Sequence, residues 1–211
     1  MQYDFIEIGT SFFNTEIENA TDKTIGLSIE PIKDYLDKLP IKQNVKKINA
    51  AISFNNTTYK DYIFYIPTET IKEHDLEFWF NGCNSIGNYH PLHIQHNVQH
   101  LVKKLEIPVI SIEALFAKND VTDINFFKID TEGTDSYILE SLFTFTSILP
   151  KKIKFEANET SNIEHVKYII DLASDKGYIT TQYSTKLSQY LDIKNDNNLY
   201  LDDVILELKE K

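Results

Sequence analysis

Short apolar runs alternate with amphipathic segments along the whole chain. Buried strands are predicted at six such runs: 3–9, 24–30, 45–53, 107–112, 124–130 and 151–158. Alternation of apolar and polar side chains predicts an antiparallel hairpin strand at 59–67. Helices are predicted where the apolar spacing becomes helical: 10–19, 31–39, 136–145 and 162–177. Two further strands, 178–184 and 202–208, are predicted to close the chain.

Strand–helix alternation at this spacing is typical of an α/β fold, in which helices cover both faces of a mainly parallel sheet. We predict a single domain over 1–211, with an irregular insertion on the substrate side at about 68–105 and a surface excursion at 185–200. Ligands bind such sheets at the carboxyl ends of the strands. The strand-end positions are therefore the candidate site: Glu7–Gly9, Glu30, Asn49–Ala51, Asp130–Glu132 and Glu156–Asn158.

The first strand ends in the loop "EIGTSFFNT", in which Gly9 permits a close backbone approach. The loop lacks the G-x-G-x-x-G pattern that binds a pyrophosphate, which argues against a nicotinamide-dependent oxidoreductase. Glu30 ends the second strand, at an interval that suits a carboxylate accepting from two ribose hydroxyls. The alternative is that Gly9 only makes a turn and that Glu30 is a charge at a helix N-terminus beside Pro31.

Six segments carry a resemblance to a known family: "FIEIGTSFFNT", "GLSIEP", "INAAIS", "ISIEALF", "INFFKIDTEGTDSYILESL" and "KFEAN". In this order they resemble the FkbM family of S-adenosylmethionine-dependent methyltransferases, from about residue 3 to 160. The segment "KIDTEG" is the most specific of these motifs and the glycine loop the least. The resemblance implies a Rossmann-like class I methyltransferase fold, with a seven-stranded, mostly parallel sheet whose last hairpin is reversed.

The resemblance also implies a set of cofactor contacts with S-adenosylmethionine. The first group would line its methionine and ribose end: Glu7, Gly9, Thr10 and Ser11. Glu30 would hold the ribose hydroxyls, and a second group would surround the adenine: Pro31, Ile32, Asn49, Ala50 and Ala51. In the segment "NGCNSIG", Asn84 and Ser85 would contact cofactor or substrate. Phe13 departs from the family, which has a glycine later in the first loop.

The resemblance further implies that Asp130 and Glu132 would face the methyl-transfer position. Carboxylates there favour a nearby cation and can orient or deprotonate an incoming hydroxyl. The two side chains alternate along an extended chain that stops at Gly133, so both can face one cleft. The alternative is that Asp130 caps the following helix and Glu132 is solvated.

Four histidines lie close together in the segment 89–100: His90, His93, His96 and His100. If the segment is helical after Pro91, the last three share one face. Such a cluster can bind a metal, line a substrate pocket or supply a base, or it can simply belong to a polar surface helix or an interface. We predict His90 as a catalytic residue because it lies nearest Asn84 and Ser85, and we assign no metal.

Composition narrows the choice of partners. The formal net charge is −11, and all 21 basic residues are lysine. Without a basic face or guanidinium groups, nucleic acid and anionic membranes are poor partners, although an AT-rich genome would also explain the missing arginine. We find no membrane-spanning run or signal peptide, and the single cysteine, Cys83, indicates a reducing compartment, so we expect a cytoplasmic protein.

The leading prediction is a methyltransferase that uses S-adenosylmethionine and methylates a hydroxyl of a small molecule or saccharide. The substrate class comes from the resemblance. The alternative is a non-catalytic cofactor-binding or interaction protein with the same fold, which the Phe13 departure would permit. The oligomeric state is left open.

Overall fold

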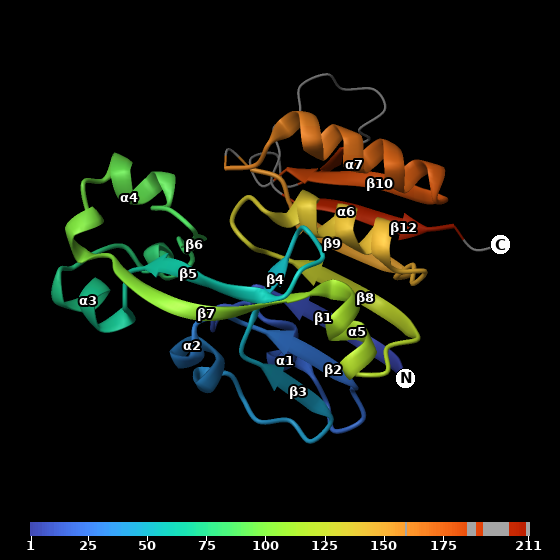
Figure 1. Cartoon of the computed structure of the whole chain (residues 1–211), viewed down its shortest axis with the longest axis horizontal. Coiled ribbons are helices and arrows are strands. Elements are labelled where there is room, and N and C mark those ends of the chain that lie inside the picture. Colours follow the sequence, from blue (N-terminus) through green and yellow to red (C-terminus); the bar gives the residue numbers. More distant parts are fainter. Residues whose placement is uncertain (159, 185–188, 192–202, 210–211) are drawn as a thin grey trace.

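The computed structural model describes residues 1–158, 160–184, 189–191 and 203–209, without the side chains of 182–184 and 189–191. Its main sheet has eight strands in the order β11-β10-β12-β9-β8-β1-β2-β3 (Figure 1). The strands are β1 (Gln2–Ile8), β2 (Gly26–Ile29), β3 (Val45–Ile48), β8 (Asp123–Ile129), β9 (Lys152–Glu156), β10 (Tyr178–Ser184), β11 (Gln189–Leu191) and β12 (Asp203–Leu208).

The strand directions confirm the predicted Rossmann-like α/β fold. Strands β3, β2, β1, β8 and β9 run parallel to one another, whereas β12 is antiparallel to both β9 and β10. This gives the seven expected strands with the last hairpin reversed, and β11 pairs antiparallel with β10 as an eighth. The carboxyl ends of β1, β2, β8 and β9 therefore meet at one edge of the sheet.

Helices cover the main sheet from two sides. Three of them, α5 (Ile112–Lys118), α6 (Asp135–Phe145) and α7 (Ile163–Asp175), share one continuous core with the central strands. On the opposite face, α1 (Glu16–Asn19) and α2 (Lys33–Lys38) pack in a smaller cluster around Phe5. The central strands are largely buried on both faces, and the buried charges they carry are paired, as Glu7 of β1 is with Lys128 of β8.

A second sheet lies beside the first, in the order β4-β7-β5-β6. Its strands are β4 (Ala51–Ser53), β5 (Tyr59–Tyr65), β6 (Ser85–Ile86) and β7 (Lys103–Ser111). β5 pairs antiparallel with β7, in agreement with the predicted hairpin strand.

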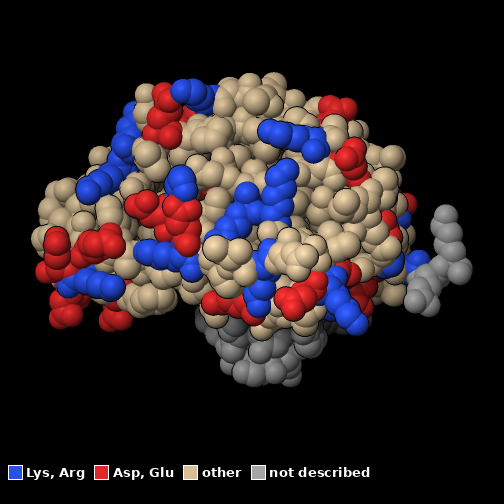
Figure 2. All heavy atoms as spheres, turned by 90° about the horizontal axis from the view of Figure 1, so that it is seen from below, with Lys and Arg blue, Asp and Glu red and all other residues tan. Residues whose placement is uncertain are grey.

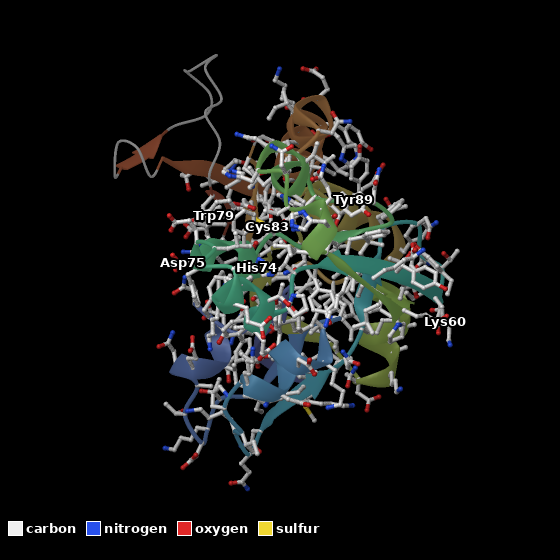
Figure 3. The ribbon with its side chains drawn as sticks, turned by 90° about the vertical axis from the view of Figure 1, so that its left-hand side faces the viewer. Lys60, His74, Asp75, Trp79, Cys83 and Tyr89 are labelled. Atoms are coloured by element: carbon white, nitrogen blue, oxygen red, sulfur yellow. The ribbon has the colours of Figure 1, made fainter. Side chains whose placement is uncertain are left out.

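The insertion, taken here as residues 68–102, connects β5 to β7. It consists mainly of short helices, α3 (Thr68–Glu73), η1 (Phe78–Asn81), α4 (Pro91–Gln95) and η2 (Gln99–Leu101), together with β6. Ile66, Ile71, Phe80, Cys83 and Val98 form a hydrophobic cluster of its own. Figure 3 looks onto this side of the molecule and labels Trp79, Cys83 and Tyr89 of the insertion.

Two predicted elements were wrong in their extent. The single strand predicted at 45–53 is broken into β3 and β4, which belong to different sheets, because Asn49 donates side-chain hydrogen bonds to Glu30 O and Pro31 O where β3 ends. The helix predicted at 10–19 is only the one-turn α1, because Ser11 and Asn14 have φ values of 48° and 57°, which a right-handed helix excludes. The predicted excursion at 185–200 lies outside the described residues, apart from β11.

No helix in the described part of the chain has the length and apolar character needed to cross a membrane. On the face shown in Figure 2, lysines are interspersed with aspartates and glutamates. Opposite charges mixed in this way are typical of a solvated surface.

Candidate functional site

A pocket opens at the carboxyl ends of β1, β2 and β8, where the sequence placed the candidate site. The second sheet and the insertion form its other wall. The lining residues are Ile8, Gly9, Thr10, Ser11, Phe13, Asn14, Glu30, Pro31, Ala50, Ala51, Ile52, Ile63, Gly82, Asn84, Ser85, Ile86, Asp130, Thr131, Glu132, Gly133, Thr134, Ile138 and Thr160. Carboxylates, hydroxyls and amides supply its polar side chains, and no lysine or histidine of the described part of the chain lines it.

The loop after β1 forms one rim of this pocket and needs glycine at its start. Gly9 has a φ of 77°, and a Cβ at this position would lie 1.8 Å from the carbonyl oxygen of Asp130. Only glycine permits both the left-handed conformation and this contact. The glycine therefore lets the loop pack against the end of β8, so that the loop and this strand end line the same pocket.

Glu30 holds the same loop in place while it lines the pocket. Its Oε2 accepts a hydrogen bond from Ser11 N at 2.7 Å, and its Oε1 accepts one from Ile32 N at 2.8 Å. The residue is only 4% exposed. Burial raises the pKa of Glu30 to about 7, against the opposing effect of the two backbone donors. Ile32 itself is buried beneath the pocket in a hydrophobic cluster with Tyr35 and does not line it.

The structure corrects the predicted role of Glu7. Its side chain is fully buried and absent from the pocket lining, because Oε1 accepts from Lys128 Nζ at 2.8 Å and Oε2 accepts from Glu16 N at 3.0 Å. Lys128 also donates to Asn14 O at 2.9 Å. Burial disfavours the ammonium charge, but the Glu7 carboxylate raises the pKa of Lys128 above its ordinary value. The Glu7–Lys128 pair therefore holds the loop after β1 against β8 through these hydrogen bonds, and Glu7 does not line the pocket.

The segment "KIDTEGTD" makes a strained turn between β8 and α6. Glu132 has a φ of 53° and Gly133 a φ of 100°, and a Cβ on Gly133 would lie 2.7 Å from Thr160 O. A glutamate in the left-handed region is unfavourable by itself and persists only where its surroundings impose it. Asp135 does so in part: it is buried and accepts from Thr131 N, Thr131 Oγ1 and Glu156 N.

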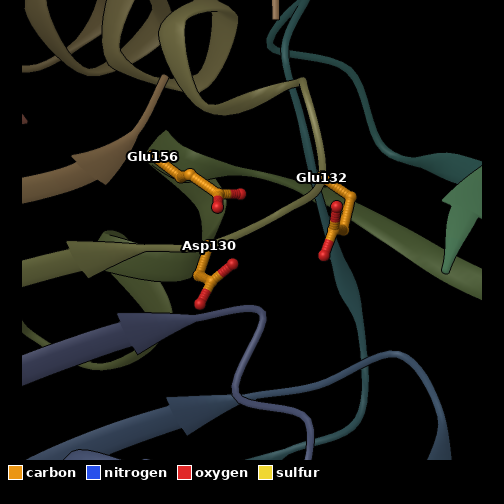
Figure 4. Close-up of side chains that lie close together, drawn as sticks. All are labelled: Asp130, Glu132 and Glu156. Atoms are coloured by element: carbon orange, nitrogen blue, oxygen red, sulfur yellow. The ribbon is translucent and has the colours of Figure 1, made fainter. Parts of the chain in front are cut away.

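Three carboxylates converge at the base of this turn. Asp130, Glu132 and Glu156 each place an oxygen within 4.8 Å of the other two, and Figure 4 shows the side chains pointing toward one another from the ends of β8 and β9. Desolvation by the surrounding protein, together with repulsion from the neighbouring carboxylates, raises the pKa of Asp130 to about 6 and that of Glu156 to about 8. Such a group favours a proton or a cation, and its geometry alone does not select a metal ion over an organic cation.

The insertion contributes two kinds of residue to the site. Gly82, Asn84 and Ser85 line the pocket directly. His90 does not, because it is fully buried behind Glu132, with Nε2 at 3.2 Å from Glu132 Oε2. His90 was predicted to be a catalytic residue, but this placement keeps its ring out of the pocket lining.

Of the three other histidines in this segment, His93 lies beside His90, with ring centroids 5.7 Å apart. α4 ends at Gln95, so His93, His96 and His100 do not share a helix face as predicted. His93 is buried, with its pKa lowered to about 4 by burial and by His90, whereas His96 and His100 are exposed. Over the described residues, only Asp130, Glu132 and Glu156 bring three possible metal-ligand side chains together.

Most of the predicted site residues lie around the one pocket. Eleven line it: Gly9, Thr10, Ser11, Glu30, Pro31, Ala50, Ala51, Asn84, Ser85, Asp130 and Glu132. Glu7, Ile32, Asn49 and His90 do not, although Asn49, like Glu7, braces its rim through hydrogen bonds. Sequence reasoning included Glu156 among the strand-end candidates, within Glu156–Asn158, but assigned it no role. It assigned none to Asp135, Thr131 or Thr160 either.

Comparison with known proteins gives a family match across most of the chain. A model of the methyltransferase FkbM domain matches residues 3–180. No curated protein matches the sequence. Among solved structures, the chain is similar to the crystal structure of precorrin-6y C5,15-methyltransferase from Geobacter metallireducens GS-15, at 12% identity and a TM-score of 0.40, over 100% of this chain and 82% of that one.

Proposed function

The chain belongs to the FkbM methyltransferase family, and from this premise we propose that it uses S-adenosylmethionine to methylate a hydroxyl group of a small molecule or saccharide. The observation that supports this most is the pocket itself. It joins a buried strand-end glutamate, Glu30, to a cluster of carboxylates at Asp130 and Glu132. A ligand with a ribose at one end and a positively charged sulfur at the other matches that distribution of groups.

The residues present fit this cofactor. Ser11 Oγ and Asn84 Oδ1 are buried polar atoms on the pocket wall without a hydrogen-bond partner among the described residues, and a bound ligand with amine and hydroxyl groups would satisfy them. Each Glu30 oxygen accepts only one backbone N–H, so the carboxylate retains lone pairs for ribose hydroxyls. The lack of a basic side chain in the lining suits a ligand without phosphates.

S-adenosylmethionine, when bound, supplies a methyl group activated by its attachment to a sulfonium. The chain's own residues would then position the acceptor and remove its proton. Glu132 is the residue best placed as base, because its side chain is 22% exposed and its Oε1 has no hydrogen-bond partner among the described residues. Glu132 would accept the proton of the acceptor hydroxyl as that oxygen is methylated, and would then release it to solvent.

The lining also indicates the kind of acceptor. Thr131, Thr134, Thr160 and Ser85 offer hydroxyls, and Asn84 offers an amide, beside the carboxylates. These groups pair well with neutral hydroxyl compounds, whereas phosphate or carboxylate groups on an acceptor would meet like charge without a balancing lysine. We therefore propose a neutral polyhydroxylated acceptor and no nucleic acid partner.

The function is tested by methyl transfer to a panel of neutral methyl glycosides, simple alcohols and their phosphorylated counterparts. We expect turnover of S-adenosylmethionine with neutral members and little with the phosphorylated ones. Cofactor binding without transfer to any member would favour the alternative, a non-catalytic binder. Phe13 lines the pocket and packs against Phe78 with ring centroids 5.3 Å apart. Its bulk would explain a loss of methyl transfer in a protein that still binds the cofactor.

Glu30→Gln is expected to weaken S-adenosylmethionine binding about 5- to 150-fold, which corresponds to about 1–3 kcal/mol for a buried hydrogen-bonding group left badly matched. The glutamine amide would turn an N–H₂ group toward either Ser11 N or Ile32 N, two groups that are themselves donors. Isothermal titration calorimetry gives the affinity. Glu106→Gln, an exposed glutamate on β7, is the matched control, and an unchanged affinity for Glu30→Gln would remove Glu30 from the ribose role.

Affinity for the cofactor should depend on pH in a manner specific to its positive charge. Because the pKa values of Asp130 and Glu30 are raised to about 6 and 7, these groups are partly protonated below neutrality and become anionic as the pH rises through that window. We expect the preference for S-adenosylmethionine over uncharged S-adenosylhomocysteine to grow roughly three- to tenfold from about pH 5.5 to about pH 8. A preference that stays constant over this range would mean that the carboxylates do not face the sulfonium.

A further inference from the structure

The contacts of His90 differ from those of a catalytic base. Its ring is fully buried and both of its nitrogens are engaged. Nδ1 accepts a hydrogen bond from Leu92 N at 3.2 Å, as the N-cap of α4. Nε2 lies 3.2 Å from Glu132 Oε2. Neither nitrogen is therefore available to take a proton from an acceptor molecule.

These two contacts fix the tautomer of the ring. A nitrogen that accepts from a backbone N–H carries no proton, so the ring is neutral and its single proton lies on Nε2. That N–H then donates to the Glu132 carboxylate. One carboxylate oxygen, Oε2, is held by His90, and the other, Oε1, is left for the pocket.

Glu132 needs an external support of this kind. Its backbone is in the left-handed region, with a φ of 53°, and its long side chain has several rotatable bonds. The insertion provides this support through His90, which donates to Oε2.

We propose that His90 is a positioning residue, which orients Glu132 for proton abstraction by donating its Nε2–H to Oε2. This proposal rests on the proposed function. It gives the insertion a role in catalysis, because His90 of the insertion holds the side chain of the base, Glu132, in one orientation. A residue 42 positions earlier in the chain thereby sets the geometry of the strand-end turn.

Two substitutions separate positioning from simple packing, because each preserves one of the two contacts. Asparagine places an acceptor where Nδ1 lies and is a favourable N-cap, but it is too short to reach Glu132. Glutamine places a donor near Nε2 and can reach Glu132, but it caps α4 poorly. We expect His90→Asn to lower kcat roughly 10- to 100-fold, while His90→Gln stays within about threefold of the native kcat. Both variants should bind S-adenosylmethionine with native affinity.

A purely structural role predicts the reverse order, with His90→Asn close to native and His90→Gln impaired in thermal stability and turnover. That order, or native kcat in both variants, would overturn the proposal. Turnover is measured against the neutral methyl glycosides of the acceptor panel. If the native protein neither binds S-adenosylmethionine nor transfers its methyl group, the proposed function fails instead.

A second measurement needs no acceptor. Two-bond ¹H–¹⁵N correlation spectra of protein labelled at histidine, with the His90 signals assigned through His90→Asn, report the ring tautomer directly. We expect the neutral form with the proton on Nε2 near pH 7.5. A ring protonated on Nδ1, or an imidazolium, would contradict the donation from Nε2 to Glu132 and would overturn the proposal independently of the kinetics.

Discussion

Glu132→Gln is expected to slow methyl transfer about 100- to 10,000-fold, the usual contribution of a positioned general base. Glutamine is nearly isosteric and can still accept from His90 Nε2, so the strained turn should survive. It cannot take the proton of the acceptor hydroxyl. We expect kcat to fall far more than the affinity for S-adenosylmethionine, because Asp130 and Glu156 keep negative charge in the cluster and the cofactor's nucleoside contacts are made by other residues.

Glu140→Gln provides the matched control for this substitution. Glu140 also pairs with a histidine, at 3.0 Å from His165 Nε2, but on the surface of α6 and outside the pocket lining. Its turnover should remain native. If Glu132→Gln retains native kcat with an acceptor that the enzyme turns over, Glu132 is not the base.

Lys128→Met is expected to destabilise the fold by about 3–5 kcal/mol, the cost of leaving one member of a buried ion pair without its partner. Methionine has a similar length and packs well, so little volume is lost. The Glu7 carboxylate, fully buried, would keep only the hydrogen bond from Glu16 N, and Asn14 O would lose its donor. Urea denaturation measures the change in the free energy of unfolding.

The same substitution at an exposed pair shows whether burial is the cause. Lys60 contacts Glu106 at 2.6 Å, with 72% and 50% of the two side chains exposed. Lys60→Met should change the free energy of unfolding by less than about 1 kcal/mol. A similarly small loss for Lys128→Met would show that the Glu7–Lys128 pair does not hold the first loop.

Sequence patterns predicted the fold well because the central strands of the main sheet are mostly buried and therefore read as predominantly apolar runs. The same reasoning located the pocket, since the ends of parallel strands meet at one edge. It failed at β3 and β4, where an apolar run continues through Asn49 although the chain changes sheets. Local hydrophobicity cannot reveal that break, which depends on side-chain hydrogen bonds to the end of another strand.

Residue roles were harder to predict than residue positions. Glu7 and Glu30 both stand at strand ends, and only the direction of each side chain decides that one pairs with Lys128 while the other lines the pocket. His90 was predicted to be near the chemistry, but its function depends on which groups its two nitrogens meet. Such distinctions come from contacts between segments far apart in the sequence, which patterning along one segment does not encode.

The central claim is that the pocket beside Glu30, Asp130 and Glu132 holds the methyl donor. A crystal structure with S-adenosylhomocysteine tests it most directly. We predict the ribose hydroxyls within hydrogen-bonding distance of Glu30 and the sulfur facing the Asp130–Glu132 carboxylates. Nucleoside density bound elsewhere on the protein, with this pocket filled only by solvent, would contradict the account.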